Sequence, residues 1–544
     1  MKKHQKKLKK IFFAVIMLGA MAAACIEDKG NYEYRDINDV AISGIDSFYT
    51  IAVGSRLTIT PVLEFSVSET QDEFEFGWFV LNRLNFYMAS QTLSTERNLN
   101  IVVTNPASSI PYWFLYCVTN INTGVRYEFR FQVSVLDEMQ NGFILLHETE
   151  NNFDIDLIST FEGRLTQYHR MLDIFESAFP RDDGRIPLDL VCYRDGISPV
   201  IGYSGKRYAV WILTDKGTDR VSVDNFQWEP TFNISGISSI PDRILQGEPL
   251  IAEKMHAPMF PTVTGGANWI YFKGDWYWYN LPEMAYFYMQ PINAPTPESQ
   301  PYKAAPFIFA NTGRGAVLFN EDDNRFEYQA VAPMQGSGYN LRTQRMGSST
   351  QMFNWENPDY SLIYMNNRTV STGFAIVKNR VTNRYELLLM ESGGMGQPPI
   401  KLGHGTFPIQ SPNLEEIKFF AFHSSLPYLY VASDEQIFRI NTNALQRWEE
   451  ITSPQLVPSG HKISKMRSTA LGFARTNQIA ICTYDPNGQI GQNGRLAFFT
   501  VVDGTGDLIL SKYPEGAVED GEYQIDMEWT GFGRIINVHY KVVP

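Results

Sequence analysis

The chain has 544 residues, with 59 Asp and Glu against 46 Lys and Arg, so its formal net charge at pH 7 is −13. No Lys/Arg cluster follows the N-terminus, and a body this acidic would repel a phosphate backbone, which excludes nucleic-acid binding. Aromatic residues reach 14% and charged residues only 19%, which excludes a disordered or coiled-coil chain and is typical of a β-rich extracellular protein.

The first 24 residues have the layout of a bacterial secretory signal. Six lysines and no acid stand within Met1–Lys10, and the apolar run Ile11–Leu18 follows. This run is too short for a bilayer, which needs about 20 apolar residues. It leads into Ala22-Ala23-Ala24-Cys25, which resembles the lipobox, where small residues precede a cysteine that becomes diacylated. We predict a signal peptide over 1–24 and lipid on Cys25; the alternative is an ordinary secretory signal with a cysteine nearby by chance.

The residues after Cys25 predict a lipidated tether over 25–37. Glu27 and Asp28 stand directly behind the anchor, which resembles the acidic export signal that sends Bacteroidetes lipoproteins to the outer face of the outer membrane. The alternative is a solvated linker. Cleavage before Cys25 would remove six lysines, leaving 40 Lys and Arg against 59 acids and a formal charge of −19.

Residues 38–138 predict a small Ig/PKD-like β-sandwich. Tyr127–Val135 alternates apolar and polar residues with a clean period of two. The segment 120–124 before it reads as a hairpin turn, with Gly124 where a positive φ is expected. Further strand-like runs lie at 49–53, 57–63, 74–81, 99–103 and 112–119. Short strands without helices between them are typical of a sandwich.

Residues 140–544 repeat one unit, an apolar strand, a polar turn and a second strand. The strand pairs are 142–146 with 153–158, 208–213 with 220–221, 269–272 with 276–279, 316–319 with 326–328, 374–377 with 385–389, 428–431 with 437–440, 471–474 with 479–482 and 496–501 with 508–510. The C-terminal run Tyr523–Val543 would complete the first unit beside Gly142. These patterns predict an all-β chain that ends in a seven-bladed β-propeller; the alternative is a stack of β-sandwiches. One exception, Leu165–Phe179, reads as a short helical insert.

The start of the mature chain resembles a known family. Cys25-Ile26-Glu27-Asp28-Lys29-Gly30-Asn31-Tyr32-Glu33-Tyr34 is similar to the Cys-x-x-Asp-Lys-Gly-Asn-Tyr-x-Tyr start of the PKD-like lipoproteins of Bacteroidetes. The likeness continues through Ile42–Leu63 and into Gly142–Leu146. It implies a SusC-like TonB-dependent transporter and a SusD-like lipoprotein as partners, and outer-membrane capture of peptides or oligosaccharides. It transfers no catalytic residue.

Catalytic and cofactor signatures are missing from the sequence. The histidines stand at no metal-ligand spacing, and neither His-Glu-x-x-His nor Gly-x-Ser-x-Gly occurs. Asp485–Gly488 resembles the start of a calcium loop, but Leu496 stands where the bidentate Glu is required, so a β-turn fits better. Cys117, Cys192 and Cys482 predict buried free thiols, with one disulfide left open. We predict no catalytic residue, no metal and no cofactor.

Aromatic residues are densest between 269 and 288. The strand Trp276–Tyr279 has aromatics on both faces, which indicates core packing between two neighbouring sheets. Tyr286, Phe287 and Tyr288 instead lie in a loop bounded by prolines, so they are candidates for a ligand or partner surface.

Two function classes follow from these observations. The first is a surface-exposed, lipid-anchored outer-membrane protein that binds nutrients for the importer without catalysis. The second is a surface propeller enzyme, a hydrolase or lyase, in which distant carboxylates converge in a channel.

Overall fold

The structure is a computed structural model of the whole chain. It describes residues 12, 15, 37–82, 88–106, 108, 110–136, 139, 141–160, 165–193, 209–223, 225–238, 240, 245, 247–256, 266–281, 291–294, 299–311, 315–330, 333–334, 338–339, 342–347, 351–393, 397–408, 412–445, 447–468, 478–513 and 525–541. The chain forms two compact units. The first contains residues 1–49, 58–99 and 112–132, and the second contains residues 50–57, 100–111 and 133–544. The predicted all-β class is confirmed, because strands dominate and the helices described after residue 37 are single short turns.

The N-terminal strands pair in three sheets. The five-stranded sheet contains β2 (Phe48–Ala52), β9 (Arg126–Leu136), β8 (Tyr112–Asn120), β5 (Phe74–Leu81) and β6 (Ala89–Ser94), in that order. The two-stranded sheets pair β1 (Val40–Ser43) with β4 (Val62–Phe65), and β3 (Arg56–Ile59) with β7 (Leu99–Val102). The strands predicted in this segment are confirmed, whereas β1 and β6 were not predicted.

An aromatic core fills the first unit. The Trp78 ring lies 4.2 Å from that of Tyr116, and the Phe114 ring lies 5.7 Å from that of Phe131, measured between centroids. All four side chains are fully buried. Phe131 is buried because β9 alternates buried and half-buried residues, as its sequence predicts. The predicted turn before β9 is also confirmed, with Gly124 at a φ of 73°.

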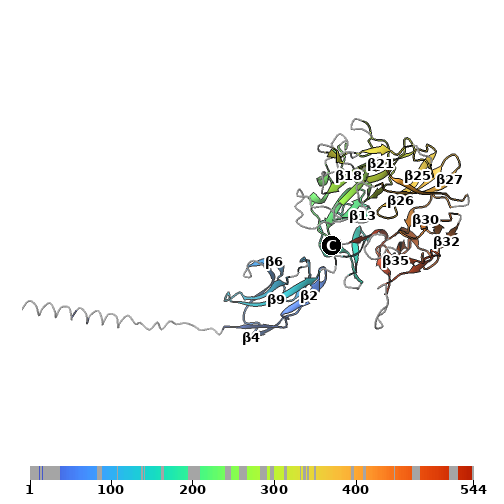
Figure 1. The fold of residues 1–544 in the computed structure, drawn as a ribbon. Coiled ribbons are helices and arrows are strands. Elements are labelled where there is room, and N and C mark those ends of the chain that lie inside the picture. Colours follow the sequence, from blue (N-terminus) through green and yellow to red (C-terminus); the bar gives the residue numbers. More distant parts are fainter. Residues whose placement is uncertain are drawn as a thin grey trace, which may run out of the picture. The chain divides into compact units, whose positions relative to one another are not determined.

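Seven antiparallel sheets follow one another along the second unit (Figure 1). The first three sheets contain β10 (Gly142–Glu148), β11 (Phe153–Ser159), β12 (Thr166–Tyr168) and β40 (Ile535–Lys541); β13 (Pro187–Tyr193), β14 (Ala209–Thr214) and β15 (Gly217–Ser222); and β16 (Lys254–His256), β17 (Gly266–Phe272) and β18 (Asp275–Leu281). The fourth and fifth contain β19 (Phe309–Asn311), β20 (Gly315–Asn320), β21 (Arg325–Ala330) and β24 (Thr343–Arg345); and β25 (Tyr360–Asn367), β26 (Thr372–Asn379), β27 (Arg384–Glu391) and β28 (Ile400–Thr406).

The last two sheets contain β29 (Phe419–Phe422), β30 (Tyr428–Ala432), β31 (Ile437–Asn441) and β32 (Trp448–Glu450); and β33 (Lys462–Ser468), β34 (Gln478–Tyr484), β35 (Gly494–Val501), β36 (Leu508–Leu510) and β39 (Glu528–Phe532). Two small strand pairs, β22 (Pro333–Met334) with β23 (Gly338–Tyr339) and β37 (Lys512–Tyr513) with β38 (Ile525–Asp526), complete the strands. The helical turns are α2 (Met171–Ile174), η3 (Pro230–Phe232) and η4 (Ile234–Ile237).

The predicted hairpins are confirmed wherever both strands are described. In β17–β18, Lys273 and Gly274 form the two-residue turn, with φ of 52° and 87°, the left-handed geometry that suits a tight antiparallel hairpin. The predicted strand 471–474 lies outside the described residues, and β34 pairs instead with β33 and β35.

The C-terminal prediction is confirmed for residues 535–541, because β40 pairs with β10 in the first sheet, whereas β39, within the same predicted run, pairs with β35 of the seventh sheet. The helix predicted over Leu165–Phe179 is wrong for most of its length. Residues 166–168 pair with β11 as β12, and Arg170 has a φ of 52°, so only four residues turn as α2. The open edge of β11 supplies backbone partners that outweigh the local preference for a helix.

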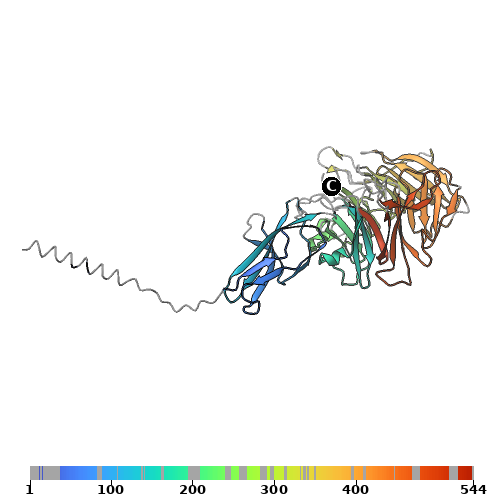
Figure 2. The ribbon, with the colours of Figure 1, turned by 90° about the horizontal axis from the view of Figure 1, so that it is seen from below.

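Each sheet of the second unit packs against two others. Shared buried clusters join the second to the third, the third to the fourth, the fourth to the fifth, the fifth to the sixth, the sixth to the seventh and the seventh to the first. Strand β40 of the first sheet packs against β13 of the second. The red C-terminal strands accordingly lie beside the cyan-green strands in both ribbon views (Figures 1 and 2).

Strand β18 shows why both of its faces are aromatic. Trp276 belongs to the cluster shared with the fourth sheet, and Tyr277 to the cluster shared with the second. Both side chains are 1% exposed. The predicted core role of this strand is confirmed for Trp276, Tyr277 and Trp278.

Candidate ligand-binding cavity

The site residues predicted from sequence lie outside the described residues. This holds for Cys25, Glu27 and Asp28 in the tether and for Tyr286, Phe287 and Tyr288 in the aromatic loop. The lipid anchor, the export signal and the aromatic surface therefore stay predictions. No helix among the residues that the structure places is long and apolar enough to cross a membrane.

A cavity of about 230 Å³ lies within the second unit. We call it the inner cavity. Most of its walls come from strands at the edges of six sheets: β13, β16, β25, β29, β33 and β40. Phe374 on β26 and Lys418 just before β29 also line it. At roughly 30 Å³ per water, this volume holds about eight waters, or one small ligand. Its main lining side chains are Asp189, His256, Tyr364, Asn366, Asn367, Phe374, Lys418, Phe419, Phe420, Phe422, Lys465, Arg467, Ser468, Asn537 and His539.

Strand β33 supplies the cationic wall. Lys465 and Arg467 stand two residues apart, so the strand period places them on one face, while Met466 between them packs into the core shared by the sixth and seventh sheets. Lys465 makes no hydrogen bond or ion pair with any residue that the structure describes. Lys418, the third lining cation, is exposed and pairs with Asp434 at 2.6 Å between Nζ and Oδ2.

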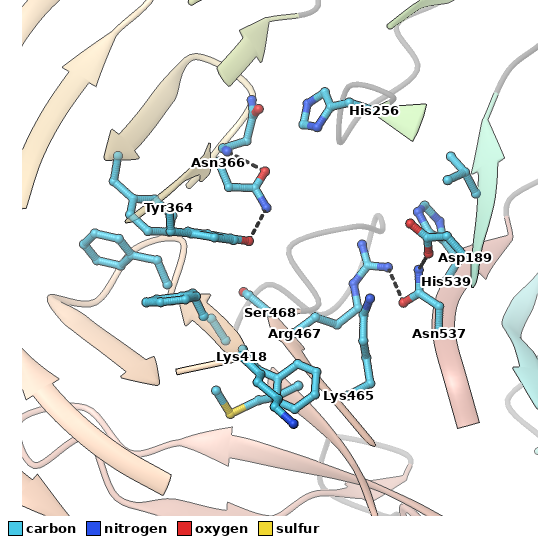
Figure 3. Close-up of a pocket in the computed structure, with 18 of the residues that line it drawn as sticks. Asp189, His256, Tyr364, Asn366, Lys418, Lys465, Arg467, Ser468, Asn537 and His539 are labelled. Atoms are coloured by element: carbon cyan, nitrogen blue, oxygen red, sulfur yellow. Dashed lines mark hydrogen bonds between the residues drawn. The ribbon is translucent and has the colours of Figure 1, made fainter. Parts of the chain in front are cut away.

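Three sheets are connected through Arg467. Its Nη1 donates to the carbonyl oxygen of Val538 at 2.6 Å and to Oδ1 of Asn537 at 3.5 Å. The Asn537 amide in turn donates to the Asp189 carboxylate and to the carbonyl oxygen of Leu190. Figure 3 shows this chain on one side of the cavity. Burial lowers the pKa of Arg467, partly opposed by the nearby Asp189.

Two histidines border the cavity without adding charge at neutral pH. Burial and the nearby charge of Arg467, opposed by a hydrogen bond with Asn367, lower the pKa of His256 to about 4. Burial, Arg467 and Lys465 hold the pKa of His539 well below its usual range. Both imidazoles are therefore neutral near pH 7 and provide only neutral donors and acceptors.

The opposite wall combines aromatic rings with an amide. Asn366 donates from Nδ2 to the Tyr364 hydroxyl at 2.8 Å, and the two lie across the cavity from Asp189 in Figure 3. The Tyr364 ring stacks on Phe420 with centroids 4.3 Å apart and 16° between planes. Burial raises the pKa of Tyr364, so its hydroxyl stays protonated.

Among the lining residues that the structure describes, Asp189 is the single carboxylate. The described residues contain no group of three His, Cys, Asp or Glu arranged to hold a metal. Cys117, Cys192 and Cys482 are buried free thiols, as predicted, and burial raises the pKa of the last two to about 12.

The sequence prediction missed every residue of the inner cavity. The one local signal is the segment 462–468, Lys-Ile-Ser-Lys-Met-Arg-Ser, where cations and hydroxyls interrupt a strand in an otherwise acidic protein. Asp189, His256 and Asn537 carry no such signal, because they stand alone in unremarkable strands more than 60 residues from one another.

The comparison with family models identifies one region. Residues 25–179 match the PKD-like family. The predicted resemblance is confirmed for this PKD-like region, which contains the N-terminal sheets and continues through β10, β11, β12 and α2. No curated protein matches the chain.

Several solved structures resemble the chain weakly. A quinonprotein alcohol dehydrogenase-like protein of Bacteroides thetaiotaomicron is 9% identical, with a TM-score of 0.43 over 93% of this chain and 100% of that one. The WD40 domain of SCAP from fission yeast is 9% identical, with a TM-score of 0.25 over 82% and 93%. PorZ, a surface component of the type-IX secretion system of Porphyromonas gingivalis, is 11% identical, with a TM-score of 0.23 over 78% and 46%. At these TM-scores none of the three carries an argument about function.

Proposed function

We propose that the chain is a non-catalytic, substrate-binding lipoprotein of a SusC/SusD-like TonB-dependent importer of peptides or glycans. The observation that carries the binding role is the inner cavity, which is enclosed by six strands and lined by cationic, amide, hydroxyl and aromatic side chains. Concave sites with a few convergent polar groups are the usual form of small-ligand sites in proteins.

The second unit fits a seven-bladed β-propeller in this proposal. Its seven successive antiparallel sheets, each packed against two others, support that arrangement, as does the completion of the first sheet by β40. The inner cavity then lies where the edge strands of the blades meet. A rigid ring of this kind holds its lining residues in place without help from a ligand.

The anchor and location rest on the N-terminal sequence. Ala22-Ala23-Ala24-Cys25 supports cleavage and lipidation at Cys25, and two or more acyl chains hold a protein firmly on a membrane. Glu27 and Asp28 support export to the outer face of the outer membrane. In that position the protein meets external peptides or oligosaccharides directly.

Partnership with the importer has a physical rationale. A binder tethered beside one transporter raises the effective concentration of scarce cargo at that pore. We propose a SusC-like TonB-dependent transporter and a SusD-like lipoprotein as partners. Mild detergent extraction, followed by purification through a tag on this chain, should recover both in stoichiometric amounts. Recovery of the chain alone, at low salt and with cargo present, would contradict the partnership.

A surface enzyme, a hydrolase or a lyase, is the second candidate. It is favoured by the imidazoles of His256 and His539, which line the same cavity as Arg467, since histidine is the side chain that most often transfers protons in catalysis. Glycoside hydrolysis through paired carboxylates is less well supported, because Asp189 is the single carboxylate among the described lining residues.

Two assays on the purified mature protein test these roles. Calorimetric binding of peptides or oligosaccharides without consumption would support the binding role. If each protein molecule instead releases many product molecules from the same library, the protein is an enzyme and the binding role is wrong.

A further inference from the structure

The inner cavity has a net positive charge inside an acidic protein. Lys465 and Arg467 contribute two positive charges and Asp189 one negative charge, which leaves a net charge of +1. Lys418 adds nothing to this balance because it is paired with Asp434. Both lining histidines are neutral near pH 7. One singly charged anion would therefore neutralise the cavity.

Arg467 is only partly used by the protein. Both of its hydrogen bonds to described residues come from Nη1. Its Nε and Nη2 remain available, and an arginine presents these donors in a planar fork that matches a carboxylate. The bond from Nη1 to the Val538 carbonyl oxygen, 2.6 Å long, holds the guanidinium at the cavity wall.

Lys465 is the second cation of this wall. It lies on the same face of β33 as Arg467 and makes no ion pair within the described part of the chain. A third cation, Lys254 on β16, is close enough to Lys465 for the two charges to interact, and its Nζ lies 4.3 Å from the centre of the Phe307 ring. These cations outnumber Asp189, the one carboxylate among the described lining residues, and such an excess of like charge is costly unless a further anion joins it.

We propose that the inner cavity binds the carboxylate of a compact polar ligand between Lys465 and Arg467. The inference rests on the proposed binding function and narrows its ligand to carboxylates. The remaining lining groups suit such a ligand, because Asn366, Tyr364 and Ser468 offer hydrogen bonds to hydroxyl or amide groups. A carboxylate of this size comes from a sugar acid or from the C-terminus of a short peptide.

Two pairs of probes separate the sources. Galacturonate is compared with galactose, and the dipeptide Ala-Ala with its C-terminal amide, by calorimetry on the mature protein at low salt. We expect one acid of the two pairs to bind at least about tenfold more tightly than its neutral analogue, the usual worth of a hydrogen bond to a charged group. Preference for galacturonate identifies a sugar acid, and preference for the dipeptide identifies a peptide terminus.

Lys465→Gln is the decisive variant. Replacing Arg467 instead would remove its hydrogen bond to the Val538 carbonyl oxygen and could unfold the protein. The variant should keep the melting temperature and lose the preference for the acid. Lys512→Gln is the matched control and should keep that preference, since Lys512 is exposed on β37 and does not line the inner cavity.

Three results would overturn the proposal. Equal binding of acid and neutral analogue would leave the binding function intact but exclude a carboxylate site. Tighter binding of inorganic phosphate than of either acid would assign the cavity to another anion. An unchanged preference in Lys465→Gln would place the carboxylate elsewhere.

Discussion

Gly142 pairs with Lys541 in antiparallel register, so the strand after Asn141 and the last described strand share one sheet. These strands are neighbours in space but almost 400 residues apart in sequence. Their pairing therefore requires nearly the whole second unit to be folded. The pairing also buries Ile535 in the core that joins the first sheet to the seventh. The stability of the second unit should therefore depend on its C-terminal strand.

The first prediction concerns that strand. Ile535 is 0% exposed, so Ile535→Ala should lower the free energy of unfolding by about 2–5 kcal/mol through lost burial and the cavity left behind. Ile509→Ala, at a side chain that is 57% exposed on β36, is the control and should change it by less than about 0.5 kcal/mol. Urea denaturation measures the free energy of unfolding of both variants. Equal midpoints for the two variants would show that β40 does not support the core.

The second prediction is a pH dependence at Asp156, a buried carboxylate on β11. Its oxygens accept hydrogen bonds from His147 Nε2 at 2.9 Å and His169 Nδ1 at 2.7 Å. The hydrogen bond to Asp156 raises the pKa of His169 against an opposing effect of burial. A raised histidine pKa adds stability below the unfolded value of about 6.5, and this stability is lost as pH rises through the folded value.

The measurement compares wild type with His169→Gln in urea at pH 5.5 and 8.5. The stability advantage of wild type should be larger at pH 5.5, by less than about 1 kcal/mol because His169 is half exposed. Burial lowers the pKa of His461, so His461→Gln should show the opposite trend. An advantage of wild type over His169→Gln that grows with pH would contradict the role of Asp156.

The third prediction concerns the anchor. Cys25→Ala should release the protein from membranes or leave it as an uncut precursor, because the acyl chains are attached through that thiol. Membrane fractionation and immunoblotting distinguish these forms. Cys117→Ala, at a buried thiol in the first unit, is the control and should stay membrane-bound. A Cys25→Ala protein that is mature and still in the outer-membrane fraction would exclude lipidation as the anchor.

The fourth prediction concerns surface display. Protease added to intact cells should digest the wild-type protein. Replacing both Glu27 and Asp28 with Ala should protect it, because the acidic export signal would be lost and the protein would remain behind the outer membrane. Full protection of wild type would place the protein in the periplasm and remove direct capture of external nutrients.

The fifth prediction concerns the aromatic loop. Tyr286→Ala combined with Tyr288→Ala should weaken the binding of cargo or partner by about one to two decades, the effect of losing a stacked ring. The melting temperature should not change. Trp276→Ala, at a buried side chain on β18, should instead lower the free energy of unfolding by about 3–5 kcal/mol. Unchanged affinity in the double variant would remove the loop from the binding surface.

Local patterns were sufficient to predict most of the strands. The period-two alternation of β9, the two-residue turn between β17 and β18 and the polar turns of the later hairpins are decided by residues close in sequence. The motif that begins at Cys25 likewise indicated the PKD-like region. Even the partner of β40 was predicted, because the first repeat unit needed a further strand beside Gly142 and the C-terminal run was left over.

Local preference failed where an available sheet edge competed with it. Residues 165–179 have a helical pattern, yet 166–168 pair with β11, and the left-handed Arg170 confines α2 to Met171–Ile174. Backbone hydrogen bonds to an existing strand outweighed a helix too short to be stable by itself.

Only the tertiary structure determined the inner cavity. Asp189, His256 and Arg467 are separated by more than 60 residues, and each has an ordinary place in its own strand. Which residue types a strand edge carries is visible in the sequence, but which edges meet depends on how the sheets pack. That packing is set by large buried side chains such as Trp276 and Tyr277, which lie in the cores between neighbouring sheets and do not line the cavity.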